Sequence, residues 1–251
     1  MNAPSPLLHP DTASTPQLSK PVPCASPIHL RAVAHLYGIE TAALENARVL
    51  ELGCETAGNL LPFALAYPNA HVVGVDLWPE NIQHGQKLAQ DIGAKNLELH
   101  NKLFTEIDQD FGTFDYIIVH DEFTWAPSFL REAILRICRE NLSPLGIAYI
   151  SYNTYPGWKA GDTLRDAMQL HNHSAGTMEE VLAGAAAMLN PMSDGLANHN
   201  PQAASLKAAV ERINQPPDYS LNGEFLQATA ASFYFIEFAE TAAQAGLAYV
   251  G

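Results

Sequence analysis

Positive charge is scarce in this sequence. It holds 13 Lys and Arg residues against 27 Asp and Glu, which gives a formal net charge of -14 at pH 7. Proteins that bind nucleic acid or anionic membranes gather Lys and Arg against the phosphate groups. The sequence therefore predicts neither nucleic acid nor a membrane as a partner, although a small local basic site is compatible with this balance.

Cysteines and long apolar runs are also few. The three cysteines, Cys24, Cys54 and Cys138, are widely spaced and form no CxxC pair. This pattern predicts reduced thiols and a cytoplasmic protein. No apolar run reaches the roughly 18 residues that a membrane span needs. The N-terminus lacks the basic and apolar regions of a signal peptide.

Strands and helices alternate over the middle of the chain. Residues 27–158 show apolar runs separated by amphipathic patterns, which predicts an α/β fold with a doubly wound, Rossmann-like, mostly parallel sheet. The first helix should begin at Pro27 and stop at Gly38, and the one after Pro79 should close at Gly93. The expected strands cover residues 48–53, 71–76, 96–100, 114–120 and 147–151, with a turn at 144–146.

The two ends of the chain differ from its middle in composition and in hydrophobic pattern. Residues 1–26 are rich in Pro, Ser, Thr and Ala and are expected to form a disordered arm. After Trp158 the alternation stops, so residues 159–251 are predicted to form a helical appendage that ends on the start of a further strand. Its expected helices cover residues 162–171, 177–189, 202–213 and 223–245.

The first strand ends in a turn of small residues, Gly53 to Asn59. The dinucleotide fingerprint GxGxxG fails there, because Glu55 stands where the second glycine would meet a pyrophosphate. Two like charges at 4 Å cost about 4 kcal/mol at an effective dielectric near 20. No GK[ST] of a P-loop follows either. The turn therefore suits a nucleoside without phosphates, and the positively charged S-adenosylmethionine meets that description.

Ligands of an open parallel sheet bind outside the carboxyl ends of its strands. At the first end, backbone N–H groups of the Gly53 turn are expected to approach the ligand. At the second, Asp76 has a carboxylate that can accept both ribose hydroxyls. The third end, residues 101–104, offers apolar side chains for an adenine, and the fourth is residues 120–123.

Several segments resemble a known family. ELGCxxxGNLLP (51–62), GVDL (74–77), SYNTYPGW (151–158) and LNGEFL…FYFIEF (221–238) resemble class I S-adenosylmethionine-dependent methyltransferases. More narrowly, they resemble the bacterial branch with a methyltransferase regulatory domain, which includes protein lysine methyltransferases. The resemblance covers roughly residues 27–251. It implies a seven-stranded sheet, a methyltransferase domain over 27–158, and the start of a regulatory or substrate domain over 159–251.

The resemblance and the strand ends together give the candidate residues. Residues expected to bind the cofactor S-adenosyl-L-methionine are Glu51, Gly53, Cys54, Gly58, Asn59, Asp76, Leu77, Lys102, Leu103 and His120. Residues expected on the acceptor side are Asp121, Tyr152, Asn153 and Tyr155, because a polar, aromatic mouth can aim an amine. No metal is expected, since His171 and His173 have no third ligand at suitable spacing.

Some alternatives stay open at this stage. The acceptor is a protein lysine or a small molecule, or the chain binds the cofactor without catalysis. Tyr155 is either an acceptor residue or the anchor of a structural turn. Position 57 carries Ala where such turns usually carry glycine; a left-handed backbone there costs about 1–2 kcal/mol, unless Gly58 takes that conformation instead. The oligomeric state is undetermined.

Overall fold

The computed structural model describes residues 19–196, 199–214, 226 and 229–250. Over these residues the chain forms two compact units. The first holds the chain up to Val119 together with Glu140–Tyr149, and the second holds His120–Arg139 and Ile150–Tyr249. No helix among the described residues is long and apolar enough to cross a membrane.

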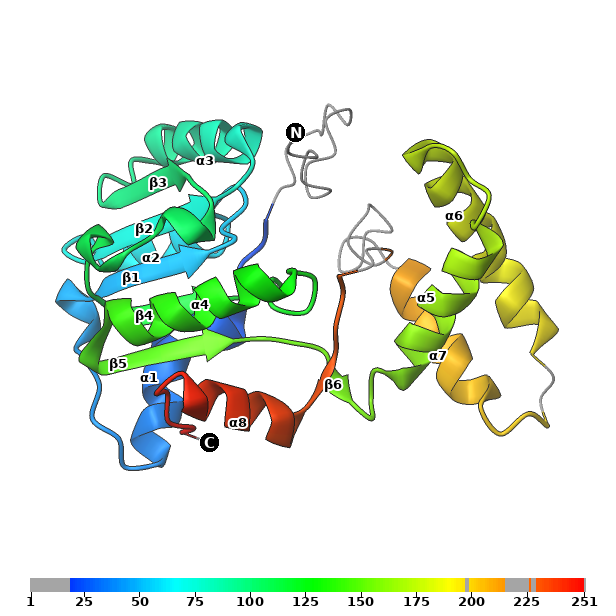
Figure 1. Cartoon of the computed structure of the whole chain (residues 1–251). Helices are drawn as coiled ribbons and strands as arrows, with labels where there is room; N and C mark the ends of the chain where they lie inside the picture. Colours follow the sequence, from blue (N-terminus) through cyan, green and yellow to red (C-terminus); the bar gives the residue numbers. More distant parts are fainter. Residues whose placement is uncertain (1–18, 197–198, 215–225, 227–228, 251) are drawn as a thin grey trace, which may run out of the picture. The chain divides into compact units, whose positions relative to one another are not determined.

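The first unit is built on a five-stranded sheet in the order β3-β2-β1-β4-β5 (Figure 1). β1 pairs in parallel with both β2 and β4, and β2 pairs in parallel with β3. The predicted doubly wound, mostly parallel sheet is therefore confirmed. The strands are β1 (Arg48–Leu52), β2 (His71–Asp76), β3 (Leu97–Asn101), β4 (Phe114–Val119) and β5 (Leu142–Ile150).

Three helices accompany these strands in the first unit. They are α1 (Pro27–Leu36), α2 (Leu60–Ala66) and α3 (Pro79–Ile92). α3 begins on Pro79 and ends at Gly93, whose φ is 79°, as the sequence predicts. One face of the sheet, with Val49 and Val72, packs against Leu30 of α1, Leu60 of α2 and Ile82 of α3 in a continuous core. Leu50 and Leu52 are fully buried as well, so β1 is covered on both faces.

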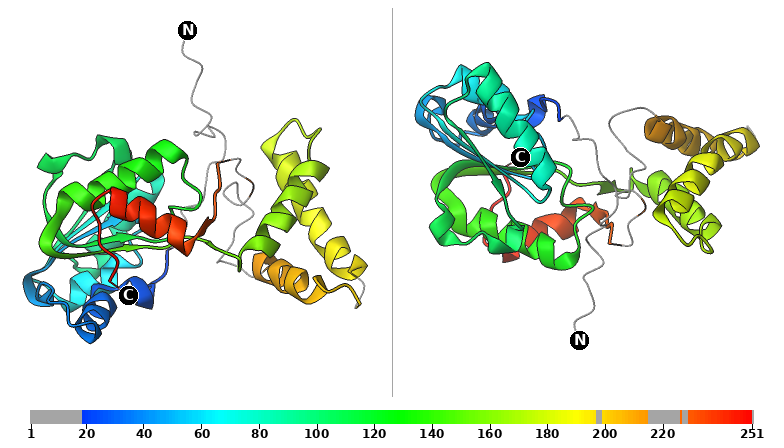
Figure 2. Two further views of the ribbon diagram at one scale, coloured as in Figure 1. Left: turned by 60° about the horizontal axis from the view of Figure 1, so that its bottom comes forward. Right: turned by 90° about the horizontal axis from the view of Figure 1, so that it is seen from above.

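The second unit contains the remaining helices and two very short strands. α5, α6 and α7 pack around Leu164, Met168, Leu189 and Val210, and they form one group in both views of Figure 2. β6 and β7 pair in parallel. The elements are α4 (Ser128–Asn141), β6 (Thr154–Tyr155), α5 (Lys159–His171), α6 (Met178–Gly195), α7 (Ala203–Asn214), β7 (Phe233–Tyr234) and α8 (Phe235–Gln244).

The structure corrects several expectations. The sheet has five strands in the described residues, where the resemblance implied seven. The turn expected at 144–146 lies inside β5. The helix expected over 223–245 is divided: β7 precedes α8, and its first residues fall outside the described part, as does most of LNGEFL. Residues 248–250 form no strand.

The end of the predicted disordered arm is ordered. Residues 1–18 lie outside the described part of the chain, but residues 19–26 are placed, with a 3₁₀ helix at Pro23–Ala25. Ala25 is fully buried in the core of the first unit. This segment therefore belongs to the first unit, whereas the low-complexity composition favoured disorder.

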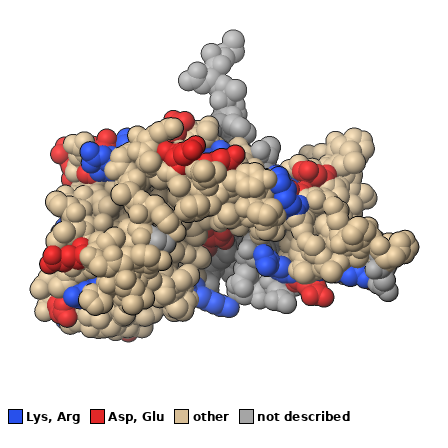
Figure 3. Space-filling model, turned by 90° about the horizontal axis from the view of Figure 1, so that it is seen from below, with Lys and Arg blue, Asp and Glu red and all other residues tan. Residues whose placement is uncertain are grey.

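Charged side chains are scattered over the face of the molecule that Figure 3 shows. On the face in Figure 3, red Asp and Glu and blue Lys and Arg form small separate groups on a mostly uncharged background. The described residues of this face show no broad field of Lys and Arg.

Candidate functional site

The turn after β1 is held by the protein's own hydrogen bonds. Five backbone N–H groups of the turn donate hydrogen bonds to other groups of the protein. The sequence predicted that these N–H groups would be open to a ligand. The donors are the amides of Gly53, Cys54, Glu55, Ala57 and Gly58, and the acceptors are Val75 O, Asp76 Oδ2, Cys54 O and Ser19 Oγ, over 2.7 to 3.1 Å.

Two non-glycine residues of this turn hold the left-handed conformation that favours glycine. Glu55 has a φ of 47° and Ala57 a φ of 64°. Each side chain costs about 1–2 kcal/mol in this region. Gly58 is not among the residues with positive φ, so the alternative in which it replaced Ala57 is wrong. Strain of this kind persists where the surroundings fix the backbone, which is common at ligand sites.

Glu51 is a buried carboxyl next to this turn. Its side chain is 3% exposed, and Asn59 Nδ2 donates to its Oε1 at 2.7 Å. Its Oε2 is buried and has no hydrogen-bond partner among the described residues. Burial raises the pKa of Glu51 to about 8; the Asn59 bond opposes this, and the nearby Glu55 and Asp76 add to it. A buried carboxyl with one unsatisfied oxygen is costly unless a partner is supplied.

Asp76 ends β2 and is 4% exposed. Its Oδ2 accepts the Glu55 N–H at 2.9 Å, and its Oδ1 accepts from Trp78 N at 2.8 Å and from Asn81 Nδ2 at 3.4 Å. Burial raises the pKa of Asp76, and these hydrogen bonds oppose the rise. Asp76 therefore also has a structural role, because its hydrogen bond with Glu55 holds the Gly53 turn against the end of β2. A carboxylate has about four acceptor positions, so one remains for a ligand.

The end of β3 offers less apolar surface than expected. Phe104 is 7% exposed and belongs to the interior, whereas Leu103 is 41% exposed. Asn101 Nδ2 donates to the carbonyls of Asp76 and Leu77 at 3.1 and 2.7 Å and so fixes this end of β2. Leu103 is left as the exposed apolar side chain of this segment, beside the half-buried Lys102.

His120 and Asp121 follow β4 and belong to the second unit. Ser151 connects them: its Oγ accepts the Asp121 N–H at 2.7 Å and lies 3.3 Å from His120 Nδ1. Asp121 is exposed and has a φ of 59°, and Trp125 Nε1 donates to its Oδ1 at 3.2 Å. Burial lowers the pKa of His120, which favours the neutral ring. The strained backbone at Asp121 marks this loop as a candidate for function.

Tyr152 and Asn153 are half-buried and lie just after β5. Tyr152 stacks on Phe238 with ring centroids 4.1 Å apart. The Asn153 N–H donates to Thr124 Oγ1 at 2.8 Å, while its buried Nδ2 has no partner among the described residues. Aromatic packing therefore fixes the Tyr152 ring, and the Asn153 side-chain NH₂ is a candidate hydrogen-bond donor to a ligand.

Tyr155 is bound on several sides within the second unit. Its hydroxyl donates to Asp162 Oδ2, and Lys159 Nζ lies 3.6 Å from the centre of its ring. Burial, followed by the neighbouring Asp162, raises the pKa of Tyr155 to about 12. Tyr155 also lies in β6, which pairs with β7. These contacts favour the interpretation of Tyr155 as a structural anchor, with one face already holding an ammonium group.

Sequence reasoning missed several residues that hold these groups in place. Ser151 had a signal, because it opens the SYNTYPGW segment. Thr124 and Ser19 had none, since a single polar residue far away in sequence carries no periodicity. Asp162, seven positions after Tyr155, was expected only as the start of a helix.

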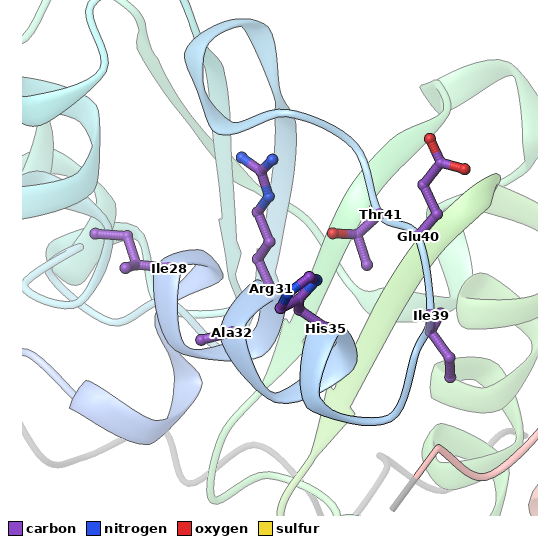
Figure 4. Close-up of a pocket in the computed structure, with 7 residues that line it drawn as sticks. All are labelled: Ile28, Arg31, Ala32, His35, Ile39, Glu40 and Thr41. Carbon is purple, nitrogen blue, oxygen red and sulfur yellow. The ribbon is translucent and has the colours of Figure 1, made fainter.

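A pocket in the first unit contains none of the predicted residues. It lies between α1 and the segment that leads to β1, and Figure 4 shows its lining side chains: Ile28, Arg31, Ala32, His35, Ile39, Glu40 and Thr41. Ligands of parallel sheets bind at the carboxyl ends of the strands. We therefore place the candidate site at the Gly53 turn and Asp76 instead.

Comparison with known proteins identifies the family. The family model described as Methyltransferase domain matches residues 43–207 of the chain. The chain belongs to the methyltransferase domain family. The predicted class I methyltransferase family is thereby confirmed.

Two relatives and one solved structure are similar to this chain. The uncharacterized protein RP789 of Rickettsia prowazekii is 41% identical over 94% of this chain and 43% of its own length. RP028 of the same organism is 35% identical over 86% of this chain and 87% of its own length. PKMT2 from Rickettsia typhi, solved in complex with AdoHcy, is 34% identical with a TM-score of 0.82, over 94% of this chain and 46% of that one. The chain thus spans less than half the length of RP789 and PKMT2.

Proposed function

We propose that this protein is an S-adenosylmethionine-dependent methyltransferase that transfers a methyl group to an amine, with a protein lysine as the acceptor. Membership of the methyltransferase domain family supports the reaction class. AdoHcy, which PKMT2 holds, is what remains of S-adenosylmethionine after methyl transfer. The segment at residues 151–158, which resembles protein lysine methyltransferases, supports the acceptor class.

The buried Oε2 of Glu51, which has no hydrogen-bond partner among the described residues, gives this proposal its main support. A buried carboxylate is stable only when a cation or further donors satisfy it. Glu51 Oε2 lacks a partner among the described residues and lies at the predicted cofactor turn. S-adenosylmethionine carries an ammonium group that fits this acceptor and favours its charged form, whereas a pyrophosphate would be repelled by the carboxylates of Glu55 and Asp76. The residues present therefore fit this cofactor.

Each remaining residue has a role that its surroundings allow. Asp76 offers its remaining acceptor position to a ribose hydroxyl, and Leu103 offers an exposed apolar surface to a base. S-adenosylmethionine supplies an electrophilic methyl group when bound. On the acceptor side, Asp121 and the Asn153 amide provide polar groups that can orient an amine. A neutral amine needs position and desolvation more than a base.

Calorimetry with AdoHcy tests the binding step. We expect the wild-type chain to bind AdoHcy and Glu51→Ala to lose at least about tenfold in affinity, since the ammonium then loses a charge-assisted hydrogen bond. Glu45→Ala, which removes an exposed carboxylate before β1, is the matched control and should bind normally. A folded wild-type protein without affinity for AdoHcy would contradict the proposal.

Incorporation of a labelled methyl group tests the reaction and the acceptor. After incubation with labelled S-adenosylmethionine and cell extract, we expect label on protein, in methylated lysine after hydrolysis. Label confined to small molecules would replace the lysine proposal with small-molecule methylation. Binding without any incorporation would indicate a cofactor-binding module.

A further inference from the structure

Residues 19–22, which precede α1, contact the turn from Gly53 to Asn59, where the cofactor is proposed to bind. The Ser19 N–H donates to Thr56 Oγ1 at 3.0 Å, and the two hydroxyl oxygens are also 3.0 Å apart. The Gly58 N–H donates to Ser19 Oγ at 2.7 Å. One residue thus contacts the turn through both its main chain and its side chain, across 37 to 39 positions of sequence.

The contact also explains Gly58. A Cβ built on Gly58 would lie 1.9 Å from the carbonyl oxygen of Ser19 and 2.9 Å from its Oγ. Gly58 needs no special φ, so close approach is the reason for glycine here. The sequence predicts Gly58 as a cofactor-binding residue, whereas the structure places the protein's own main chain against it.

Three residues further on, the same segment reaches the buried acid. The Val22 N–H donates to Asn59 Oδ1 at 2.8 Å, and Asn59 Nδ2 donates to Glu51 Oε1 at 2.7 Å. An N–H donor fixes which end of the amide is oxygen. Val22 therefore turns the Asn59 amide so that its NH₂ faces Glu51, and Glu51 Oε2 is left for a further donor.

We propose that Ser19 is a positioning residue for the cofactor, holding Thr56 and Gly58 in the arrangement that binds S-adenosylmethionine. Its hydroxyl fixes the Gly58 amide, and the segment from Ser19 to Val22 sets the Asn59 amide against Glu51. The turn needs such an outside support because Glu55 and Ala57 both hold a left-handed conformation. This inference rests on the proposed function, since it assigns Ser19 to the same site.

The test compares Ser19→Ala and Ser19→Thr in the full chain by calorimetry with AdoHcy. Ser19→Ala removes the hydrogen-bonding hydroxyl, and we expect affinity to fall about fivefold to tenfold, the effect of one lost hydrogen bond of about 1–1.5 kcal/mol. Ser19→Thr keeps the hydroxyl and should restore affinity to within about threefold of wild type. Lys20→Ala, at the exposed next residue, is the matched control and should bind as wild type does.

Amide hydrogen exchange supplies a second measurement that does not need the ligand. In Ser19→Ala the Gly58 amide should exchange about tenfold faster, while the Ala57 amide, bonded to Cys54 O at 2.7 Å, should change little. Both results together support the positioning role.

Three outcomes would overturn it. Faster exchange at Gly58 with unchanged affinity would reduce Ser19 to a structural contact. Tighter binding by Ser19→Ala would show that Ser19 competes with the ligand for the Gly58 amide. Absence of binding by the folded wild-type chain would remove the proposed function and this inference together, which distinguishes that failure from the other two.

Discussion

At the scale of single residues, the candidate site is a cluster of acids with unequal surroundings. Asp76 accepts three hydrogen bonds from the protein, whereas Glu51 has one donor and one unsatisfied oxygen. Glu55 adds a third acid at the rim of the turn. Because the cofactor is positively charged, binding should stabilise the charged form of Glu51 above all.

Glu51 should make stability fall as pH rises. Its pKa in the folded chain is about 8, against 4.5 as the ordinary value. Between these values the folded state binds more protons than the unfolded state, so the free energy of unfolding decreases from about pH 4.5 to pH 8 and levels off above. Urea unfolding over this range should show the decline in wild type and a flatter profile in Glu51→Gln. Identical profiles for the two proteins would contradict the raised pKa.

Glu55 should be open to a stabilising substitution. Glu55→Gly removes a Cβ from a left-handed residue and should raise the free energy of unfolding by about 1 kcal/mol, after the larger entropy of the unfolded glycine chain is counted. Glu55→Gln is the control that keeps the strained backbone and removes only the charge. It should leave the strain in place while lowering the pKa of Glu51. Chemical denaturation of both variants measures the difference, and a less stable Glu55→Gly would refute the strain argument.

At the scale of elements, the buried strands were the most predictable part. β1, β2 and β4 end within one residue of their predicted ends, because continuous apolar runs bounded by turn residues mark buried parallel strands. β6 and β7 were missed, since strands of two residues depend on pairing across about 80 positions and leave no periodic pattern. They join the YNTYPGW and FYFIEF segments, which the sequence linked only by resemblance.

Gly85 in α3 and Gly195 in α6 should respond in opposite ways to alanine. Gly85 lies in α3, where a Cβ would stand 2.8 Å from Leu99 Cδ1 and 3.0 Å from the Thr56 carbonyl oxygen. Gly85→Ala should therefore destabilise the first unit by about 1–3 kcal/mol despite the better helix propensity of alanine. Gly195 ends α6 with open space around it, so Gly195→Ala should gain up to about 0.5 kcal/mol. Thermal unfolding compares them, and a stabilised Gly85→Ala would contradict the close packing of α3 on the turn.

At the scale of the whole molecule, the chain combines a sheet unit and a helical unit. The sheet unit was predictable in its class and in the order of its elements. The support of its turn by Ser19 was not, because it joins a low-complexity segment to a motif by contacts that only the folded chain creates. The cofactor-side residues, the acceptor-side residues and the cytoplasmic location stay predictions.

Ligand binding should stabilise the first unit selectively. AdoHcy at about 100 times its Kd should add about 2.7 kcal/mol to the free energy of unfolding of the state that binds it. Hydrogen exchange with and without AdoHcy should show new protection in residues 53–59 and around Asp76, with α5 to α7 changing less. Protection confined to those three helices would contradict the placement of the site.

The net charge of -14 predicts a negative result with nucleic acid. Duplex DNA should show no salt-dependent shift in mobility at micromolar protein concentrations, because too few Lys and Arg residues are available to displace counterions from phosphates. Lysine-rich proteins, in contrast, should associate with this negatively charged protein at low salt. Binding of DNA that weakens as salt rises would contradict this prediction.

The contact between Ser19 and Gly58 also bears on where the domain begins. Helical periodicity starts at Pro27, and a boundary drawn there would look natural to anyone trimming the chain for expression. Such a cut would remove the hydroxyl bound to the Gly58 amide and the Val22 amide that orients Asn59. The smallest self-sufficient fragment therefore starts at least eight positions earlier than the regular secondary structure suggests. Screens that compare start sites on either side of Ser19 should separate active from inactive preparations.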